Sequence, residues 1–315
     1  MSIVSFIFYV LNVKIFKSLN MRTNINRHTF DTYSTKRVTY ILATKNRAAL
    51  LKRAIERAKK LKKENDELIV VDGDSTDKTI KIIKSVGKLV DKYISEPDIS
   101  PTHATNKAIL LSRGKYIKLL TDDDIFYEKA MEQALSILGE HPEIEILECG
   151  GTSYNTSTKI TDTFYKPPGT NFGQNMDDIF RFRSCGLSLI IKRTVFSKVG
   201  LFSSSDMISD ATFIVNSFHS GIKLRFVRVK LFRFTIHGTN TSLDPKVSKL
   251  IYNCIRDNAS KIYFLRYAFS WYLDKYPFLK LLFSPLILSL RLTKAYFGAK
   301  ESKQKDKYIW DAGFS

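Results

Sequence analysis

Three consecutive carboxylates, Asp122, Asp123 and Asp124, directly follow the apolar run "KYIKLL" at residues 115–120. Carboxylate oxygens are ligands that Mg²⁺ and Mn²⁺ prefer, and such a cation neutralises charge that builds up on phosphate oxygens. The same acids are also typical of a helix N-cap, because a helical pattern begins near Tyr127 and carboxylates stabilise helix N-termini. The residues favour a metal site and leave open which of the three acids bind.

The elements that must position these acids are short strands that alternate with helices. The runs "VTYILA" at 38–43, "LIVV" at 68–71 and "KYIKLL" are apolar on both faces, as in strands covered by helices. Between the first two runs, apolar residues recur at helical spacing from Leu51 to Leu61. The alternation predicts an α/β fold with a Rossmann-like, mainly parallel sheet covered by helices.

Polar residues follow each predicted strand. Thr44, Lys45 and Asn46 come after the first strand, and "DGDSTD" at 72–77 comes after the second. The acid triplet, Asp122–Asp124, comes after the third. Because ligands of such folds bind at the carboxyl ends of the parallel strands, we expect all three clusters to lie along one rim of the sheet.

The second half of the chain has a more mixed pattern. The runs at 187–192 and 224–238 predict strands, and "SDATFIVNSFHSG" at 209–221 predicts a helix. From about Asp244 the chain reads as helical and is rich in aromatic and basic residues. We therefore divide the chain into an N-terminal extension at 1–36, an α/β domain at 37–243 and a helical, basic, amphipathic C-terminal tail that associates with a membrane at 244–315.

The charge balance predicts an anionic partner. Fifty Lys and Arg against 31 Asp and Glu give a net charge of +19, which suits nucleic acid, a lipid surface or a phosphorylated substrate. No helix-turn-helix, zinc-finger or RNP-type pattern is present, so a basic nucleic-acid-binding module is the weaker alternative and no nucleic-acid partner is expected. Cys149, Cys185 and Cys254 are widely spaced without a CxxC pair, which favours a reducing, cytoplasmic setting.

Two apolar stretches bear on membrane association. The stretch from Ile3 to Val13 is shorter than the roughly 20 residues that span a bilayer, and its pattern fits an interfacial anchor and an over-extended start equally. Residues 276–298 contain Pro277 and Pro285 among basic residues, which favours an amphipathic surface element over a span. The sequence predicts a protein that is peripheral at the cytoplasmic face of an anionic membrane.

The loop after the second strand permits a phosphotransferase interpretation. Residues 72–76, "DGDST", fit the DxDxT signature of haloacid-dehalogenase-type phosphotransferases, in which Asp72 would be the nucleophile and Asp74 the general acid. In that family the motif follows the first core strand and enters a flap, whereas here another strand precedes it and an amphipathic helix follows at once. These two departures make the phosphotransferase the weaker of the two enzymatic interpretations, and it is kept as an alternative.

Four polar segments occur in a fixed order: Thr44–Asn46, "VVDGDSTDKT" at 70–79, "EPDISPTHATNK" at 96–107 and the acid triplet. In this order and spacing they resemble family 2 glycosyltransferases of the GT-A fold, strongly over residues 37–125. The resemblance implies an inverting enzyme that depends on a nucleotide-sugar donor and on Mn²⁺ or Mg²⁺. It also implies transfer from a UDP- or dTDP-sugar to a lipid-linked or polysaccharide acceptor in cell-surface glycan synthesis.

The same resemblance assigns roles on the donor side. Thr44 and Asn46 would border the nucleotide. Asp72 matches the acid that accepts a hydrogen bond from the base N3, a role that suits a group that only accepts. Asn106 and Lys107 match the third segment, in which Lys107 would meet phosphate or sugar charge.

The resemblance also places the metal motif. Thr121 falls at the first acidic position and Asp123 and Asp124 at the pair, so Asp123 would hold the ribose and Asp124 the metal. Asp122 and Asp124 form a literal D-x-D as well, so a register one position away stays open. His237, after a predicted strand, stands where related enzymes contact the diphosphate or the metal.

Asp210 matches the acid that acts as catalytic base toward the acceptor hydroxyl in this family. On its own residues, Asp210 equally fits a cap of the helix predicted at 209–221. Both interpretations stay open at this point.

Overall fold

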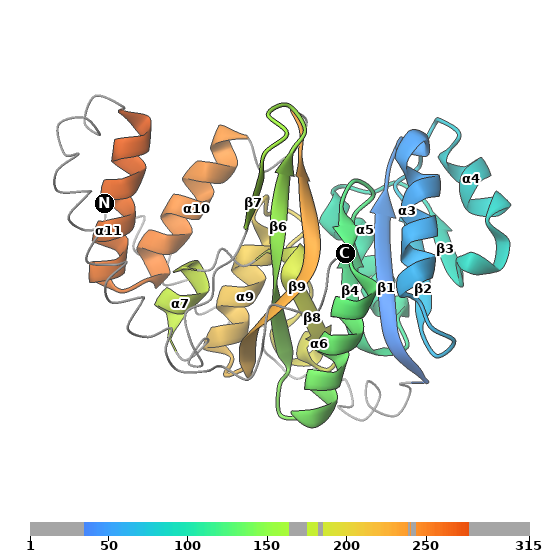
Figure 1. Cartoon of the computed structure of the whole chain (residues 1–315), viewed down its shortest axis with the longest axis horizontal. Coiled ribbons are helices and arrows are strands. Elements are labelled where there is room, and N and C mark those ends of the chain that lie inside the picture. Colours follow the sequence, from blue (N-terminus) through green and yellow to red (C-terminus); the bar gives the residue numbers. More distant parts are fainter. Residues whose placement is uncertain (1–34, 164–174, 182–184, 239, 241–243, 277–315) are drawn as a thin grey trace, which may run out of the picture.

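The computed structural model describes residues 35–163, 175–181, 185–238, 240 and 244–276. Its centre is a nine-stranded mixed sheet in the order β3-β2-β1-β4-β8-β6-β9-β5, with β7 paired to β6 (Figure 1). The strands are β1 (Lys36–Thr44), β2 (Glu67–Asp72), β3 (Lys92–Ser95), β4 (Gly114–Leu120), β5 (Ile125–Phe126), β6 (Ile146–Asn155), β7 (Thr161–Thr163), β8 (Leu189–Lys192) and β9 (Leu224–Ile236).

The first half of the sheet is parallel, as predicted. β1 pairs in parallel with both β2 and β4, and β2 pairs in parallel with β3. The second half differs, because β8 runs antiparallel to β4 and to β6, and β5 runs antiparallel to β9. The prediction of a Rossmann-like sheet covered by helices is confirmed, and the parallel pairing from β1 to β4 lies in the half of the sheet where strands and helices alternate along the chain.

Helices cover both faces of the sheet. α3 (Ala48–Leu61), α4 (Thr79–Ser85) and α6 (Glu128–Glu140) contribute to the apolar cluster on one face, and α3 and α6 lie in front of the sheet in Figure 1. The other face holds a second apolar cluster. Its helices are α5 (Pro101–Leu111), α7 (Met176–Arg181), α8 (Val195–Val199) and α9 (Ser209–His219). The short η1 (Gly87–Leu89) and η2 (Gly186–Ser188) are 3₁₀ turns.

Strand β6 is absent from the sequence-based prediction, because Gly150 and Gly151 interrupt its apolar pattern. The pairing of β6 with β9 shifts register at these two glycines, which marks a β-bulge. A Cβ atom at Gly151 would lie 2.6 Å from Cζ of Phe232, whose side chain is fully buried. Gly151 is therefore required by the close approach of an aromatic ring.

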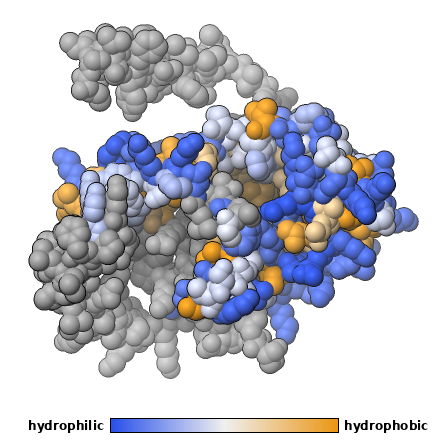
Figure 2. Space-filling model, turned by 90° about the horizontal axis from the view of Figure 1, so that it is seen from above, coloured by the Kyte–Doolittle hydropathy of each residue, from blue (hydrophilic) through white to orange (hydrophobic). Residues whose placement is uncertain are grey.

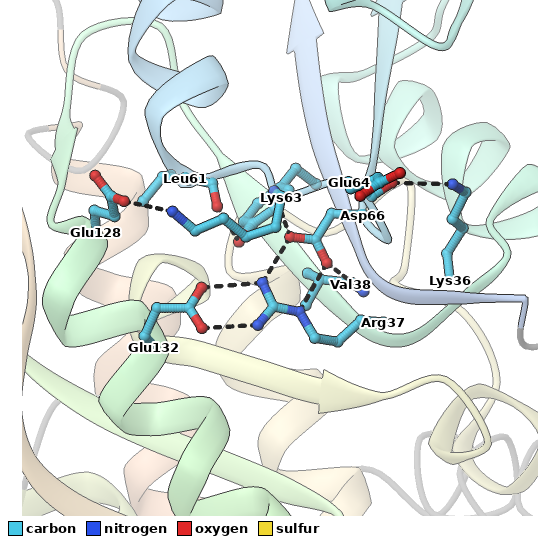
Figure 3. Close-up of polar contacts among 10 residues, drawn as sticks. Lys36, Arg37, Val38, Leu61, Lys63, Glu64, Asp66, Glu128 and Glu132 are labelled. Atoms are coloured by element: carbon cyan, nitrogen blue, oxygen red, sulfur yellow. Dashed lines mark hydrogen bonds and ion pairs between the residues drawn. The ribbon is translucent and has the colours of Figure 1, made fainter.

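An ion-pair network fixes the amino ends of β1 and β2 (Figure 3). The Arg37 guanidinium donates to Asp66 at 3.0 and 2.8 Å and to Glu132 of α6 at 2.7 and 3.0 Å. The fully buried Asp66 carboxylate also accepts from the backbone N–H groups of Val38 and Lys63. These bonds join α6 to β1 and β2 at the amino ends of the two strands, opposite the carboxyl ends where Thr44 lies.

Two capped helices end the described chain. Asp244 is the N-cap of α10 (Pro245–Asn258), and its side chain accepts from the Lys246 N–H at 2.8 Å. Ser260 is the N-cap of α11 (Lys261–Lys275), and its hydroxyl accepts from the Tyr263 N–H. Among the described residues no helix has the length and apolarity to cross a membrane. The predictions for 1–34 and for the stretch after Tyr276 lie outside the described residues, and the domain boundaries stay predictions.

Candidate active site

The carboxyl ends of β1, β2 and β4 meet at one rim, as the sequence predicts. Thr44 is in register with Asp72 on β2, and Leu42 is in register with Leu120, which precedes the acid triplet. The Thr44 hydroxyl is buried and has no hydrogen-bond partner within the described part of the chain. Figure 2 looks onto the side where β1 and β6 end, and the coloured residues visible there are mainly hydrophilic, with hydrophobic residues in small separate patches.

Asp72 is fully buried and organises the loop that follows it. Its carboxylate accepts from the Ser75 N–H at 3.0 Å, from the Ser95 hydroxyl at 2.8 Å and from the Ser75 hydroxyl. A carboxylate offers about four acceptor sites, so these donors leave room for one further bond. In a phosphotransferase of this type the motif follows the first core strand, whereas here β1 precedes β2 and α4 begins at Thr79, directly after the loop, which argues against that alternative.

Asn46 joins the loop after β1 to the loop after β2. Its backbone lies in the left-handed region at φ 53°, a conformation that Asn tolerates better than most residues. The Asn46 N–H donates to the Ser75 hydroxyl at 2.7 Å, and its side-chain oxygen accepts from the Thr76 N–H at 2.8 Å. Thr44, Asn46 and Asp72 are thus brought together, and their contacts with a nucleotide stay predictions.

Asn106 and Lys107 already have protein partners. The Asn106 side chain donates to the Phe202 carbonyl at 2.7 Å and accepts from the Phe202 N–H at 3.1 Å, which ties α5 to the segment before α9. The Lys107 ammonium lies 2.7 Å from carboxylate oxygens of both Glu96 and Asp98. These contacts assign both residues a part in holding the rim loops, and a direct contact with donor stays a prediction.

The three acids of the triplet have different surroundings. Asp122 forms an ion pair with Arg47, in which Nε of Arg47 lies 3.0 Å from Oδ2 of Asp122. Asp123 Oδ2 lies 2.9 Å from Nε2 of His237 and 3.5 Å from Arg47. Asp124 turns the other way: it accepts from the Thr235 N–H at 2.7 Å and from the Thr121 hydroxyl at 2.5 Å. Asp122 and Asp123 therefore contact charged side chains at the rim, whereas Asp124 is bonded to Thr121 and to the backbone of β9.

Helix capping does not explain the triplet. α6 begins at Glu128, and the residue at its N-cap position is Tyr127, with no side-chain hydrogen bond to the helix. The cap interpretation of these acids is therefore wrong.

Burial changes the acidity of two of the three acids. It raises the pKa of Asp122, which the nearby Arg47 opposes. It also raises the pKa of Asp124 to about 6, although the hydrogen bonds from Thr121 and Thr235 lower it.

The candidate metal ligands already have protein partners. Asp123 Oδ2 and His237 Nε2 lie side by side at the rim and contact each other at 2.9 Å, whereas the Asp124 oxygens accept from Thr235 and Thr121. Within the described ranges, no three His, Cys, Asp or Glu side chains converge as a metal cage. The assignments of Asp122, Asp124 and His237 to a metal, and of Asp123 to the nucleotide-sugar, stay predictions.

Asp210 is held by one hydrogen bond from its own helix and one from η2. Its Oδ2 accepts from the Gly186 N–H at 2.9 Å and its Oδ1 from the Ala211 N–H at 2.9 Å. The N-cap position of α9 is Ile208, and Asp206 accepts from the Ile208 N–H and from the Thr212 hydroxyl. Asp206 therefore orders the start of this helix, and Asp210 does not cap it.

Asp210 lies in a partly buried environment next to η2 and β4. The side chain is half-buried, and burial raises the pKa of its carboxyl although the Gly186 N–H lowers it. A Cβ atom at Gly186 would lie 3.8 Å from Leu119 of β4 and 3.9 Å from Asp210, so these residues are neighbours. The strand that leads into the acid triplet thus passes next to Asp210.

Arg47 is the rim residue that the sequence analysis missed. It links the loop after β1 to both Asp122 and Asp123 and is partly exposed. The sequence contains a signal for this contact, because Arg47 directly follows Asn46 at the rim where the three acids are also expected, and opposite charges pair.

Comparisons with known proteins bear on the family. The model described as Glycosyl transferase family 2 matches residues 39–200, just over half of the chain. Glycosyltransferases of Rickettsia typhi and Rickettsia prowazekii are 28% and 27% identical over 173 and 217 residues, or 53% and 66% of this chain. The alignments cover 54% and 67% of those two proteins, so the chain spans about half to two thirds of their length.

Solved structures share the fold. S. aureus TarS (residues 1–349) in complex with UDP-GlcNAc aligns at a TM-score of 0.57 and 15% identity, covering 71% of this chain and 68% of that one. The mannosyltransferase PcManGT from Pyrobaculum calidifontis, in complex with GDP-Man and Mn²⁺, aligns at 0.53 and 13%, covering 88% and 90%. From this family match over more than half of its length, the chain belongs to glycosyl transferase family 2.

Proposed function

We propose that this chain is a metal-dependent, inverting glycosyltransferase that moves a sugar from a UDP- or dTDP-sugar to a lipid-linked or polysaccharide acceptor. Two observations support the proposal: Thr44 and the pair Asp123 and His237 lie at the rim where β1 and β4 end, and Gly186 lies between Asp210 and Leu119 of β4. Structural neighbours bind UDP-GlcNAc and GDP-Man, which supports a nucleotide-sugar donor. The acceptor class and a role in cell-surface glycan synthesis rest on the sequence motifs.

Asp123 and His237 are the residues that would hold the cation. Mg²⁺ and related ions commonly bind one or two protein groups, with substrate phosphates and water completing the shell. When bound, the cation would supply charge neutralisation for the departing diphosphate. Arg47 pairs with Asp122 and thereby limits the negative charge that the rim presents to an anionic donor. A neighbour in complex with GDP-Man and Mn²⁺ supports this part of the proposal.

Asp210 would act as the base that takes the proton of the acceptor hydroxyl. A carboxylate with a raised pKa is a stronger base in its ionised form than an ordinary carboxylate, and burial raises the pKa of Asp210. The Gly186 N–H orients Oδ2, and the fixed backbone of α9 orients Oδ1, so the carboxylate is held before substrate arrives.

The test is nucleotide release from UDP-, dTDP- and GDP-sugars with and without Mn²⁺. We expect Asp123→Asn and Asp210→Asn to lower turnover by about 100-fold or more, because each removes a charge that acts in the reaction. Asp257→Asn, at an exposed acid of α10, is the matched control and should keep wild-type turnover. If Asp123→Asn and Asp210→Asn both turn over at the wild-type rate, the proposal is wrong.

The outer face of α11 supports a membrane surface as the place of action. Apolar side chains recur there at alternating spacings of three and four residues and remain between 38 and 67% exposed. They are Ile262, Leu265, Phe269, Tyr272 and Tyr276. The opposite face packs on α10, where Tyr252 contacts the rings of Phe264, Tyr267 and Trp271.

An anionic bilayer is the occupant that fits this stripe. Lys261 and Arg266 flank it, the whole chain carries +19, and tyrosines place an apolar ring and a polar tip at a lipid boundary. A second copy of the chain fits less well, because one stripe on a 15-residue helix is small against the roughly 800 Å² per partner of stable interfaces. α10 also contacts α9, which carries Asp210, so a lipid-linked acceptor would approach from this side.

The matched pair Leu265→Glu and Leu110→Glu tests the surface. Leu265 on α11 is 66% exposed and Leu110 on α5 is 63% exposed, so the two variants differ in place and not in chemistry. We expect Leu265→Glu to lose co-sedimentation with vesicles that contain phosphatidylglycerol and Leu110→Glu to keep it. Equal binding by both variants removes the membrane surface from the proposal, and a loss of dimer in sedimentation by Leu265→Glu would favour a second copy instead.

A further inference from the structure

Lys118 is a fully buried ionisable side chain that the proposed reaction does not use. It lies on β4, in register with Tyr40 of β1, at 0% exposure. Its Nζ donates to the Leu187 carbonyl at 2.5 Å and to the Leu189 carbonyl at 3.3 Å, and it lies 4.8 Å from the centre of the Phe126 ring. A buried ammonium is unfavourable unless it is hydrogen-bonded, so these carbonyls are essential partners.

The segment that Lys118 holds is the one that orients Asp210. Leu187 lies in η2, and the neighbouring Gly186 donates its N–H to Asp210 Oδ2 at 2.9 Å. The Ser188 hydroxyl lies 3.3 Å from Oε1 of Glu148, another fully buried residue, on β6. Three ionisable side chains from β4, β6 and α9 therefore converge on three consecutive residues of a 3₁₀ turn.

We propose that Lys118 is a positioning residue that acts through η2 to hold the Gly186 N–H against Asp210. This inference rests on the proposed function, in which Asp210 is the base. An ammonium group has three donors and satisfies two carbonyls at once, which no apolar residue of similar length does. Replacing a buried charge by a well-packed apolar residue is often neutral or stabilising, so the presence of a charge here points to placement of the turn.

The placement also relates the base to the donor side. Lys118 is two residues before the end of β4, and the acid triplet follows that strand directly. One strand therefore fixes both the loop that carries Asp123 and, through Lys118, the turn that holds Asp210. A change in the Lys118 contact should alter how the base faces the acceptor and leave donor binding intact.

The test compares Lys118→Met with Lys192→Met in the full chain. Lys192 also donates to a backbone carbonyl, that of Pro142, at 2.8 Å, at an exposed position, which makes it the matched control. We expect Lys118→Met to lower kcat about 10- to 100-fold with an unchanged donor KM, because it removes charge-assisted bonds. The acid limb of the kcat profile should move to higher pH, since the Gly186 N–H stabilises the ionised carboxylate.

Amide hydrogen exchange at residues 185–189 supplies a readout that does not depend on activity. We expect faster exchange of this segment in Lys118→Met and wild-type exchange in Lys192→Met. Unchanged exchange and an unmoved pH limb in Lys118→Met overturn the inference. If Asp210→Asn keeps wild-type turnover while Lys118→Met exchanges faster, the base assignment fails and the mechanical link stands. Should Lys118→Met lose its cooperative unfolding transition, Lys118→Gln, which keeps a donor, is measured in the same way.

Discussion

His237 and Asp123 lie side by side, with Nε2 of His237 2.9 Å from Oδ2 of Asp123, although 114 positions separate them in the chain. The contact joins the end of β9 to the loop after β4. It also distinguishes Asp123 from Asp124, whose oxygens face Thr121 and Thr235. Adjacent acids of one sequence motif therefore serve different purposes.

The first prediction separates these two acids by their effect on metal binding. Asp123→Asn should weaken Mn²⁺ affinity in the presence of UDP by at least about tenfold, because it removes a charged ligand. Asp124→Asn should keep that affinity within about threefold, since the amide still accepts from Thr235 and donates to Thr121. Isothermal titration with Mn²⁺ measures both. The reverse order, with Asp124→Asn the weaker binder, would restore the register that the sequence suggests.

The second prediction concerns stability against pH through Lys118. Burial lowers the pKa of Lys118 to about 8, below the ordinary lysine value that applies in the unfolded chain. Between the two values the unfolded chain binds more protons, so the contribution of Lys118 to stability rises with pH over this window. Below pH 8 the buried charge opposes folding in full.

Urea unfolding of the wild type and Lys118→Met at pH 7 and pH 9.5 checks this window. The free energy of unfolding of the wild type should rise relative to Lys118→Met by about 2 kcal/mol between the two pH values, because a shift of one pKa unit corresponds to about 1.4 kcal/mol. Taking the difference between the proteins cancels the other lysines and tyrosines. A constant difference across the window would show that Lys118 titrates normally.

The third prediction assigns Asn106 to stability. Asn106→Ala leaves the Phe202 N–H and carbonyl without their partner in a buried place and should lower the free energy of unfolding by about 2–3 kcal/mol. The exposed Asn216→Ala on α9 should change it by less than about 0.5 kcal/mol. Unfolding in urea and donor KM are both measured. A raised donor KM with unchanged stability would instead support the nucleotide-sugar contact predicted from the sequence.

The fourth prediction ranks the network in Figure 3. Asp66→Asn should destabilise the protein by about 2–3 kcal/mol, because the fully buried carboxylate accepts from Arg37, Val38 and Lys63. Glu132→Gln should destabilise by less than about 1 kcal/mol, since its side chain is 38% exposed and water screens the pair. Unfolding at low and high salt measures both, and only the Glu132 effect should fall with salt. Equal effects would contradict the ranking.

Local pattern in the sequence determined much of the parallel half of the fold. The runs at 38–43, 68–71 and 115–120 are strands because apolar residues on both faces suit a covered sheet, and the helix from Ala48 to Leu61 follows from spacing along one face. Parallel strands end at one edge, so the gathering of Thr44, Asp72 and the acid triplet on one rim was predictable as well.

Tertiary structure alone decided which atoms do what on that rim. Asp122, Asp123 and Asp124 are identical in type, and their different partners come from β9 and from Arg47, which are distant in the chain. β6 was missed because Gly150 and Gly151 interrupt its apolar pattern, and the Phe232 ring that requires Gly151 comes from β9, far along the chain. Lys118 reads as one more lysine of a basic chain until the fold closes β8 and η2 over it. The sequence by itself determined the elements of the parallel half and the family. Long-range packing decided the partners of each side chain, because hydrogen bonds depend on direction and burial in three dimensions.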